Sequence, residues 1–376
     1  MAFELWMHGI SPEDPQACME RLHDLGFSAV VLGADQRQLA AAKKVGLGAY
    51  ACTGTFSRSK EFQDERYLAV DVEGSPREWF GSTCPNREPV RKANLSQVEE
   101  ILSKTEADGV LLDGCRFASP ASGLEAFFTC FCPTCEAKAR EMGYDFARMR
   151  KQVRMIYRML ADGRLAKRPV DMNPFNLLSS VSVFPGLGDW ISFRAECITE
   201  HFSKASELVR GMGAKMGAYI FTPCLSPLVG QRYSSLAGLL DIASPMIYRN
   251  YPDDEGPACL NKEAAALARF LRRGGLKDSK AVETVNRFLG LCEEKKAISA
   301  IDREISVESI EQELRRTAQY LEGRPKLVPI LYLGDELVEN SVQAAASAGL
   351  DGVNFFVYKD EWSGVVERIS QCASSK

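Results

Sequence analysis

The stretch Ala107-Asp-Gly-Val-Leu-Leu-Asp113 combines a turn, a glycine and a short apolar run that ends at a carboxylate. A glycine that closes a helix just before a buried apolar run is typical of the passage from one βα unit to the next. Comparable turns stand at 25–27 and 349–352, each ahead of another apolar run. The pattern predicts repeated βα units around a parallel sheet.

Eight such runs alternate with amphipathic helical segments along the 376 residues. The runs are 3–8, 29–33, 48–53, 109–113, 215–221, 242–248, 327–333 and 352–358. Helices are expected at about 15–25, after Ser11-Pro12, and from Ser96 to Lys104. Eight strands with intervening helices close into a (β/α)8 TIM barrel. The alternative is an open doubly wound sheet, but the first strand lacks the Gly-x-Gly-x-x-Gly turn typical of that fold.

The spacing of the strands predicts one barrel domain, 1–376, with three long insertions. They follow strands three, four and six, at about 54–95, 114–214 and 249–326. Segments that follow strands emerge at the carboxyl-terminal face of a barrel, where this fold carries its chemistry. Prolines and glycines between Arg168 and Asp189 indicate either an ordered loop or lid, or a plain surface loop.

The composition excludes several classes of protein. No stretch approaches the roughly 20 apolar residues that span a bilayer. The 46 basic and 50 acidic residues, with a pI near 5.7, provide no strong field for phosphate backbones, so nucleic acid is not an expected partner. The first residues show no basic region followed by an apolar one, and we expect a cytoplasmic protein.

Three of the 12 cysteines form the run Cys130-Phe-Cys132-Pro-Thr-Cys135. Thiols stay reduced in the cytosol, and three of them within six residues are better suited to a tetrahedral metal ion than to disulfides. A fourth ligand has two candidates, Cys84 in the strand-three insertion and Cys115 after strand four. Most of the remaining cysteines stand singly and are expected to be small buried hydrophobes.

The order Cys84-Pro-Asn, then Cys-x-Cys-x2-Cys after strand four, resembles the zinc-bearing β-galactosidases of glycoside hydrolase family 42. The resemblance covers roughly residues 80–140. It implies a structural zinc ion held by Cys84, Cys130, Cys132 and Cys135, with no ligand position left open for water. The alternatives are reduced cysteines without metal, or an iron–sulfur cluster, whose usual spacings differ.

Strand four ends at Asp113, where the strand meets the functional face. The segment Leu112-Asp-Gly-Cys-Arg116-Phe is similar to a pattern of barrel proteins classed with the glycoside hydrolases, and family 42 places its general acid/base at the end of this strand. Those enzymes carry Asn-Glu where this chain has Leu112-Asp113, so the geometry toward a partner is not carried over. The alternative role of Asp113 is an ion pair with Arg116 that fixes the loop.

Glycoside hydrolysis usually requires a second carboxylate. Strand seven, which carries the nucleophile in family 42, is followed here by Asp335 and Glu336, and these residues also fit the first turn of a helix, where acids are common. Further acids near strand ends, Asp35, Asp71 and Asp360, are expected to be caps or solvated charges.

Aromatic and polar residues near the same strand ends fit a carbohydrate site, because sugar rings stack on aromatic faces and hydroxyl groups need fixed hydrogen-bond partners. The candidates for substrate binding are Trp6, His8, Arg116, Tyr219, Tyr248, Arg249, Tyr332 and Tyr358. Ser244-Pro-Met-Ile-Tyr248 and Trp190-Ile-Ser-Phe-Arg194 also resemble segments of glycoside-hydrolase-type barrels.

The sequence therefore favours an O-glycosidase that acts on an oligosaccharide, with Asp113 as general acid/base. The alternative is a barrel that binds carbohydrate without cleaving it, because the second carboxylate is not defined. No His-Glu-x2-His or Gly-x-Ser-x-Gly motif is present, which argues against a zinc-dependent or serine hydrolase. Cys115 beside His8 is a minor candidate nucleophile.

Overall fold

The computed structural model describes residues 2–10, 14–165, 183–252, 258–321, 325–358 and 363–374. Within these ranges, one nine-stranded sheet runs in the order β10-β11-β1-β2-β3-β6-β7-β8-β9, and a pairing of β10 with β8 closes it. The pairings of this sheet are parallel. The predicted (β/α)8 barrel is confirmed.

The eight predicted runs correspond to the eight strand positions of the barrel. Strand seven is divided into two short strands at Pro329, which has no amide hydrogen to donate to a neighbouring strand. The barrel strands are β1 (Glu4–His8), β2 (Ala29–Leu32), β3 (Gly48–Gly54), β6 (Gly109–Asp113), β7 (Lys215–Phe221), β8 (Ile242–Met246), β9 (Lys326–Leu327), β10 (Ile330–Tyr332) and β11 (Gly352–Phe356).

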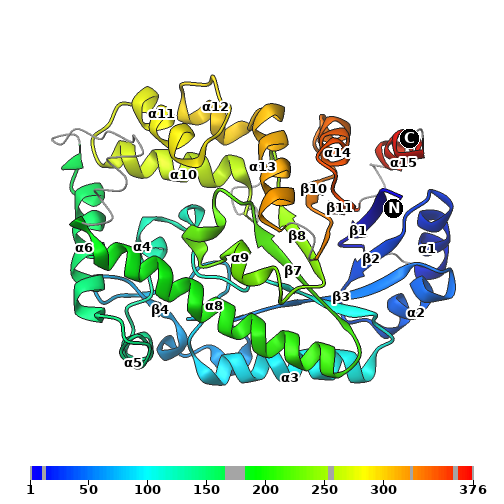
Figure 1. The fold of residues 1–376 in the computed structure, drawn as a ribbon, viewed down its shortest axis with the longest axis horizontal. Coiled ribbons are helices and arrows are strands. Elements are labelled where there is room, and N and C mark those ends of the chain that lie inside the picture. Colours follow the sequence, from blue (N-terminus) through cyan, green and yellow to red (C-terminus); the bar gives the residue numbers. More distant parts are fainter. Residues whose placement is uncertain are drawn as a thin grey trace.

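Helices between the strands cover the outside of the barrel (Figure 1). They are α1 (Pro15–Asp24), α2 (Gln36–Lys44), α3 (Glu88–Lys104), α8 (Pro185–Gly211), α9 (Tyr233–Leu236), α13 (Val307–Tyr320), α14 (Val338–Ser347) and α15 (Ser363–Ser374). The expected start of a helix after Ser96 is wrong, because α3 begins eight residues earlier, at Glu88, with a proline in its first turn. Ser11-Pro12 lies outside the described residues, and the side chain of Asp14 caps α1.

The three insertions carry their own short elements, which gather at one side of the molecule, the left in Figure 1. The first contains β4 (Ala69–Val70) and β5 (Pro76–Arg77), the second η3 (Pro120–Ser122), α4 (Leu124–Phe127), α5 (Pro133–Glu141) and α6 (Phe146–Ala161), and the third α10 (Leu260–Arg273), α11 (Asp278–Leu289) and α12 (Ile298–Arg303). Residues 166–182, most of the expected loop or lid, lie outside the described ranges, and α8 begins at Pro185.

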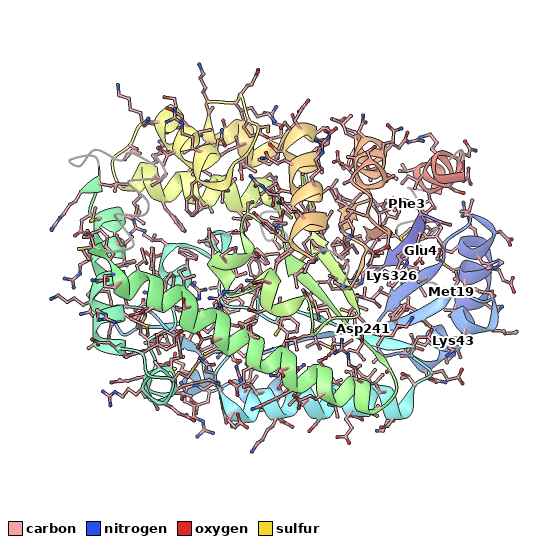
Figure 2. The ribbon with its side chains drawn as sticks, in the orientation of Figure 1. Phe3, Glu4, Met19, Lys43, Asp241 and Lys326 are labelled. Carbon is pink, nitrogen blue, oxygen red and sulfur yellow. The ribbon has the colours of Figure 1, made fainter. Side chains whose placement is uncertain are left out.

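The amino-terminal end of the barrel is closed by ion pairs. Glu4 on β1 pairs with Lys326 on β9, and Figure 2 shows both beside the barrel strands. Lys43 on α2 pairs with Asp108, just before β6, at 2.9 Å. These charged groups pair with one another, whereas barrels of this fold carry their chemistry at the opposite, carboxyl-terminal end.

One buried hydrophobic cluster extends from the barrel strands into the insertions. It contains Val30 and Ile242 from the barrel as well as Met149 and Phe270 from insertion helices. Among the described residues, no helix combines the length and the apolar character that crossing a bilayer requires.

Candidate functional site

Asp113 ends β6 and is half-buried among groups of the barrel interior. Its electrostatic neighbours include Cys52, Tyr219 and Tyr248. Burial raises the pKa of the Asp113 carboxyl, although Arg116 and the Gly114 N–H, which donates to Oδ1 at 2.7 Å, act in the opposite direction. In the described chain no carboxylate–guanidinium contact within 4.0 Å joins Asp113 to Arg116. The carboxyl group is therefore not held in a loop-fixing ion pair.

Tyr219 and His8 form a hydrogen-bonded pair across the barrel. Tyr219 Oη lies 2.7 Å from His8 Nδ1, and Asn354 Nδ2 donates to Tyr219 Oη at 3.1 Å. Burial lowers the pKa of His8 to about 4, so the imidazole is neutral at pH 7. Sequence reasoning missed Asn354, although a polar residue inside the apolar strand Gly352-Val-Asn-Phe-Phe is a usable signal for an interior hydrogen-bonding role.

Aromatic rings surround the side of the mouth formed by β8, β10 and β11. The ring of Tyr251 lies 4.9 Å from that of Tyr332 and 6.2 Å from that of Phe356, and Tyr248 lies 6.0 Å from Phe356. Tyr248 is buried, whereas the other three are half-buried. The predicted Tyr248 and Tyr332 thus meet in one cluster, to which the structure adds Tyr251 and Phe356.

Arg116 lies on the other side of Asp113, among aromatic side chains. Its guanidinium carbon is 4.8 Å from the ring of Phe221 at the end of β7, 5.0 Å from that of Trp79 and 5.7 Å from that of Phe80. Phe80 is 45% exposed at this rim. Burial lowers the pKa of Arg116, and the nearby Glu263 and Asp113 act against this shift. Arg116 is thus a nearly buried cation beside the candidate acid.

Glu263 on α10 is a buried carboxylate that sequence reasoning missed. Its Oε2 accepts a hydrogen bond from Ala121 N at 2.8 Å, which ties the third insertion to the second. Burial raises the pKa of Glu263, while Ser119, the Ala121 N–H and Arg116 lower it. In the sequence this glutamate is one of many charges on a helix, and only the tertiary packing turns it inward.

Asp335 and Arg249 form a closed ion pair. Arg249 donates to both carboxylate oxygens of Asp335, at 2.8 and 2.5 Å, and also to Glu304 at 2.7 Å. Asp335 Oδ1 further accepts from Leu337 N at 3.0 Å, in the turn that precedes α14 and not in the first turn of the helix that was expected. Glu336 is exposed. Asp335 and Arg249, both predicted site residues, therefore pair with each other. All the carboxylates that the Arg249 guanidinium contacts here belong to the protein itself.

Three other predicted side chains lie away from the mouth. Trp6 is buried deeper in the barrel, stacked on Tyr50 at 4.9 Å, because alternate residues of β1 face inward and only His8 reaches the carboxyl-terminal layer. Tyr358 lines a small gap with Cys18 and other residues between α1 and α15. Cys115 is buried, and burial raises the pKa of its thiol, which disfavours the nucleophilic thiolate.

Two of the other acids considered from the sequence have structural roles. Asp35 caps α2 by accepting from the N–H groups of Arg37 and Gln38. Asp71 is buried and accepts from a turn of backbone N–H groups and from Arg77 Nε at 2.7 Å. Asp360 lies outside the described residues.

The four cysteines named from the sequence come together. Cys84, Cys130, Cys132 and Cys135 are buried, and their sulfur atoms all lie within 4.8 Å of one another. The Cys84 sulfur is 3.5 Å from that of Cys135 and 3.8 Å from that of Cys132. A tetrahedral ion with metal–sulfur bonds of about 2.3 Å requires sulfur atoms about 3.8 Å apart. The cluster is therefore able to bind a metal ion, whereas Cys115 is not part of it.

Donors around the cysteine cluster point at its sulfur atoms. Val70 N donates to Cys130 Sγ at 3.3 Å, and Asn86 Nδ2 donates to Cys135 Sγ at 3.3 Å. Arg91 holds Asn86 in turn through its Oδ1. Hydrogen bonds of this kind stabilise thiolates, which is the form that binds metal.

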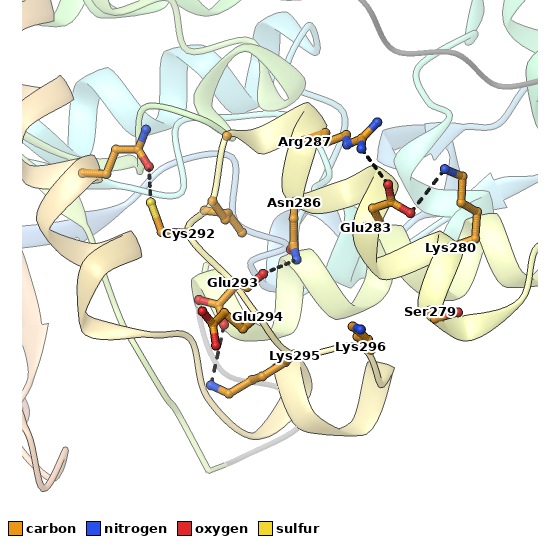
Figure 3. Close-up of a pocket in the computed structure, with 13 residues that line it drawn as sticks. Ser279, Lys280, Glu283, Asn286, Arg287, Cys292, Glu293, Glu294, Lys295 and Lys296 are labelled. Atoms are coloured by element: carbon orange, nitrogen blue, oxygen red, sulfur yellow. Dashed lines mark hydrogen bonds and ion pairs between the residues drawn. The ribbon is translucent and has the colours of Figure 1, made fainter.

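A separate hollow of about 1120 Å³ lies between α11, α13 and the segment 290–296 (Figure 3). No strand end contributes to its lining. Its charges largely pair with one another: Glu283 contacts Arg287 at 2.8 Å and Lys280 at 3.2 Å, and Lys295 lies 3.6 Å from Glu293. None of the predicted site residues lines this hollow.

Comparisons with known proteins agree with the fold. No protein-family model and no curated protein matches the chain. Over its full length it is similar to the PgaB (BpsB) glycoside hydrolase domain from Bordetella bronchiseptica, with a TM-score of 0.60, 12% identity and 100% of both chains covered. The catalytic domain of a β-amylase from Paenibacillus polymyxa has a TM-score of 0.52 and 14% identity, with 99% of this chain and 98% of that chain covered. The structural neighbours are thus glycoside hydrolase TIM barrels.

Proposed function

We propose that this protein is a glycoside hydrolase that cleaves an O-glycosidic bond in an oligosaccharide, with Asp113 as general acid/base. The proposal rests on the placement of Asp113 at the carboxyl end of β6, inside a closed barrel, where burial raises its pKa and no ion pair holds it. A carboxyl group with a raised pKa keeps the proton that the leaving oxygen requires. The activities named for the two structural neighbours support the same class of reaction.

In the proposed reaction Asp113 donates its proton to the glycosidic oxygen as the bond to the anomeric carbon breaks. A second carboxylate attacks that carbon or activates a water molecule, and in a retaining enzyme Asp113 then takes a proton from the incoming water. We assign the second role to Asp335 or Glu336, after β10. Glu336 is exposed to solvent, whereas Asp335 would have to break its ion pair with Arg249 before it could act.

The sugar is proposed to lie between the two sides of the mouth. Tyr248 and Tyr332 provide aromatic faces, Tyr219 and His8 provide a fixed polar pair beside Asp113, and Arg116 closes the other side. Trp6, Arg249 and Tyr358 are left out of this set because each is engaged elsewhere in the fold.

The test is a screen of aryl glycosides and oligosaccharides with the wild type and Asp113→Asn. Loss of the proton donor should reduce kcat by about 100-fold or more, with little change in substrate binding. Asp24→Asn, an exposed acid at the end of α1, is the matched control and should keep full activity. Equal activity of Asp113→Asn and the wild type would refute the assignment.

A barrel that binds carbohydrate without cleaving it is the second candidate. The observation in its favour is the closed ion pair of Asp335 with Arg249, which occupies one of the two candidate nucleophiles. On this reading an oligosaccharide binds the wild type and Asp113→Asn with similar affinity, and no cleavage product forms with either protein.

We also propose that the cysteine cluster holds a structural zinc ion. The sulfur spacing and the N–H donors fit four thiolate ligands, and such a site leaves no position for water. The ion would hold the insertions after β3 and β6 together beside the mouth. The alternatives, reduced thiols or an iron–sulfur cluster, are distinguished by the metal content of the purified protein.

A further inference from the structure

Four buried arginines stand out in the described chain: Arg91, Arg116, Arg194 and Arg249, each at most 7% exposed. A buried guanidinium is costly unless an anion lies close to it. Arg249 pairs with Asp335 and Glu304, and Arg91 lies 3.1 Å from Glu200. Two of the four are therefore neutralised by protein carboxylates.

The positive charge of Arg194 is compensated by a different kind of group. Its guanidinium lies over the rings of Trp190, Phe117 and Phe127, and Nη2 donates to Ala118 O at 2.9 Å. No carboxylate contacts it within 4.0 Å among the described residues. The cysteine cluster lies close enough to act on it electrostatically, and thiolates there would supply the compensating charge.

Among the described residues, no anionic group contacts Arg116 directly. Nη1 donates to Phe117 O at 3.1 Å, and three aromatic rings hold the faces of the guanidinium. Asp113 and Glu263 influence it electrostatically, but neither contacts it within 4.0 Å in the described structure.

The free donors of Arg116 also differ from those of Arg194. Nε and Nη1 of Arg194 are sealed, buried atoms without partners, whereas no atom of Arg116 belongs to that class among the described residues. Nε and Nη2 of Arg116 therefore keep some contact with solvent, next to the exposed ring of Phe80, although the residue as a whole is only 7% exposed. A planar cation fixed by its faces, with its edge open, is suited to paired hydrogen bonds with an oxyanion.

We propose that Arg116 binds an anionic group of the substrate, so that the glycan cleaved at Asp113 carries a carboxylate, sulfate or phosphate on the sugar next to the scissile bond. The inference rests on the proposed glycosidase function and names its substrate class. Asp113 at the end of β6 precedes Arg116 by three residues, so an anion on the guanidinium edge would place the sugar beside the candidate proton donor.

The test compares neutral sugars with anionic partners of the same skeleton. The probes are D-glucose against D-glucuronate, D-glucose 6-sulfate and D-glucose 6-phosphate, with the corresponding galactose set, measured by titration calorimetry at low salt. The wild type should bind at least one anionic form about tenfold or more tightly than its neutral parent, as charge-assisted hydrogen bonds allow. The anionic sugar that binds most tightly identifies the anionic group that Arg116 recognises.

Arg116→Met should remove this preference, and Arg116→Lys should keep part of it. Arg37→Met, at an exposed position on α2, is the matched control and should leave the preference unchanged. If Arg116→Met does not fold, two other measurements test the role of Arg116. Arg116→Lys should keep part of the preference for anionic sugars, and the wild type should lose the preference at high salt. Equal binding of neutral and anionic sugars, or no binding of any anionic sugar, overturns the inference.

A parallel measurement of hydrolysis separates the two proposals. Cleavage of neutral oligosaccharides that depends on Asp113, without any preference for anions, would refute the role of Arg116 alone. Anion binding that depends on Arg116, without turnover of any anionic oligosaccharide, would refute the glycosidase and leave the anion site.

Discussion

Two carboxyl groups share the field of one guanidinium at the mouth of the barrel. Asp113 and Glu263 both lie near Arg116, and burial raises the pKa of both carboxyl groups. An opposite charge within a few ångströms usually lowers the pKa of a carboxyl group, so desolvation dominates here. The raised pKa of Asp113 is what a proton donor requires, because it keeps the carboxyl group protonated.

The raised pKa of Glu263 predicts a particular dependence of stability on pH. A carboxyl group whose pKa is higher in the folded than in the unfolded state contributes its full stabilisation below the unfolded value of about 4.3, and loses it as the pH rises through the folded pKa. Glu263→Gln cannot ionise and keeps an oxygen acceptor for Ala121 N. The stability of this variant relative to the wild type should therefore improve, on the order of 1 kcal/mol, as the pH rises above about 4.

Urea denaturation of both proteins at several pH values measures this difference. Glu200→Gln is the opposite control, because Lys138 and Lys204 outweigh partial burial and lower the pKa of Glu200 to about 2. That variant should lose stability relative to the wild type as the pH rises from about 2 to about 4.3, and the difference should stay constant above this range. Parallel curves for wild type and Glu263→Gln would show that Glu263 ionises normally.

At the scale of elements, the cysteine cluster brings together two insertions that are far apart in the sequence. Cys84 belongs to the insertion after β3, and the other three cysteines to the insertion after β6. The proposed ion would close these long loops and so stabilise the folded state, because metal binding is coupled to folding.

The wild type should contain about one zinc ion per chain, and Cys132→Ser should lose it and melt about 5 °C lower or more. Metal content by mass spectrometry and thermal unfolding followed by circular dichroism provide the two readouts. Cys292→Ser, an exposed cysteine outside the cluster, should keep both the metal and the melting temperature. Purified wild type without any metal would exclude the proposed ion.

Close contact between β6 and β7 requires a glycine at position 109. A Cβ atom there would lie 2.2 Å from the carbonyl oxygen of Lys215, the residue paired with Gly109 in the register. Gly109→Ala should therefore reduce the free energy of unfolding by about 2 kcal/mol or more. Gly33→Ala, where no atom lies within 4 Å, is the control and should change it little, as measured by urea denaturation. Equal stability of the two variants would contradict this account.

The elements were predictable because their signals are local. Short apolar runs, three of them after glycine turns, identified the barrel strands, including the end of β6 at Asp113. The start of α3 was missed because the run from Glu88 to Ser96 includes a proline and several polar residues that fit a loop as well as a first helical turn. The break in strand seven follows from Pro329, whose effect was not foreseen.

The candidate site was less predictable, because it depends on which side chains meet. Cysteine spacing identified the cluster, since four residues of one rare type form a strong pattern. Glu263 and Asn354 come from elements far from Asp113 in the sequence. Nothing local distinguishes Glu263 from the other charges of its helix, whereas Asn354 stands out only as a polar residue inside an apolar strand. Trp6 and His8 share one face of β1, and only the depth of the barrel separates them.

At the scale of the whole molecule, barrel and insertions share one hydrophobic cluster, which predicts a single unfolding transition. Variants that keep a single tryptophan, Trp6 in the barrel or Trp190 on α8 beside the second insertion, report on the two regions by fluorescence. Both are buried in that cluster. Their urea midpoints should coincide with each other and with the midpoint from circular dichroism. A Trp190 transition at lower urea would show instead that the insertions form a separate folding unit, and the mouth would then owe its shape to the proposed metal ion more than to the barrel.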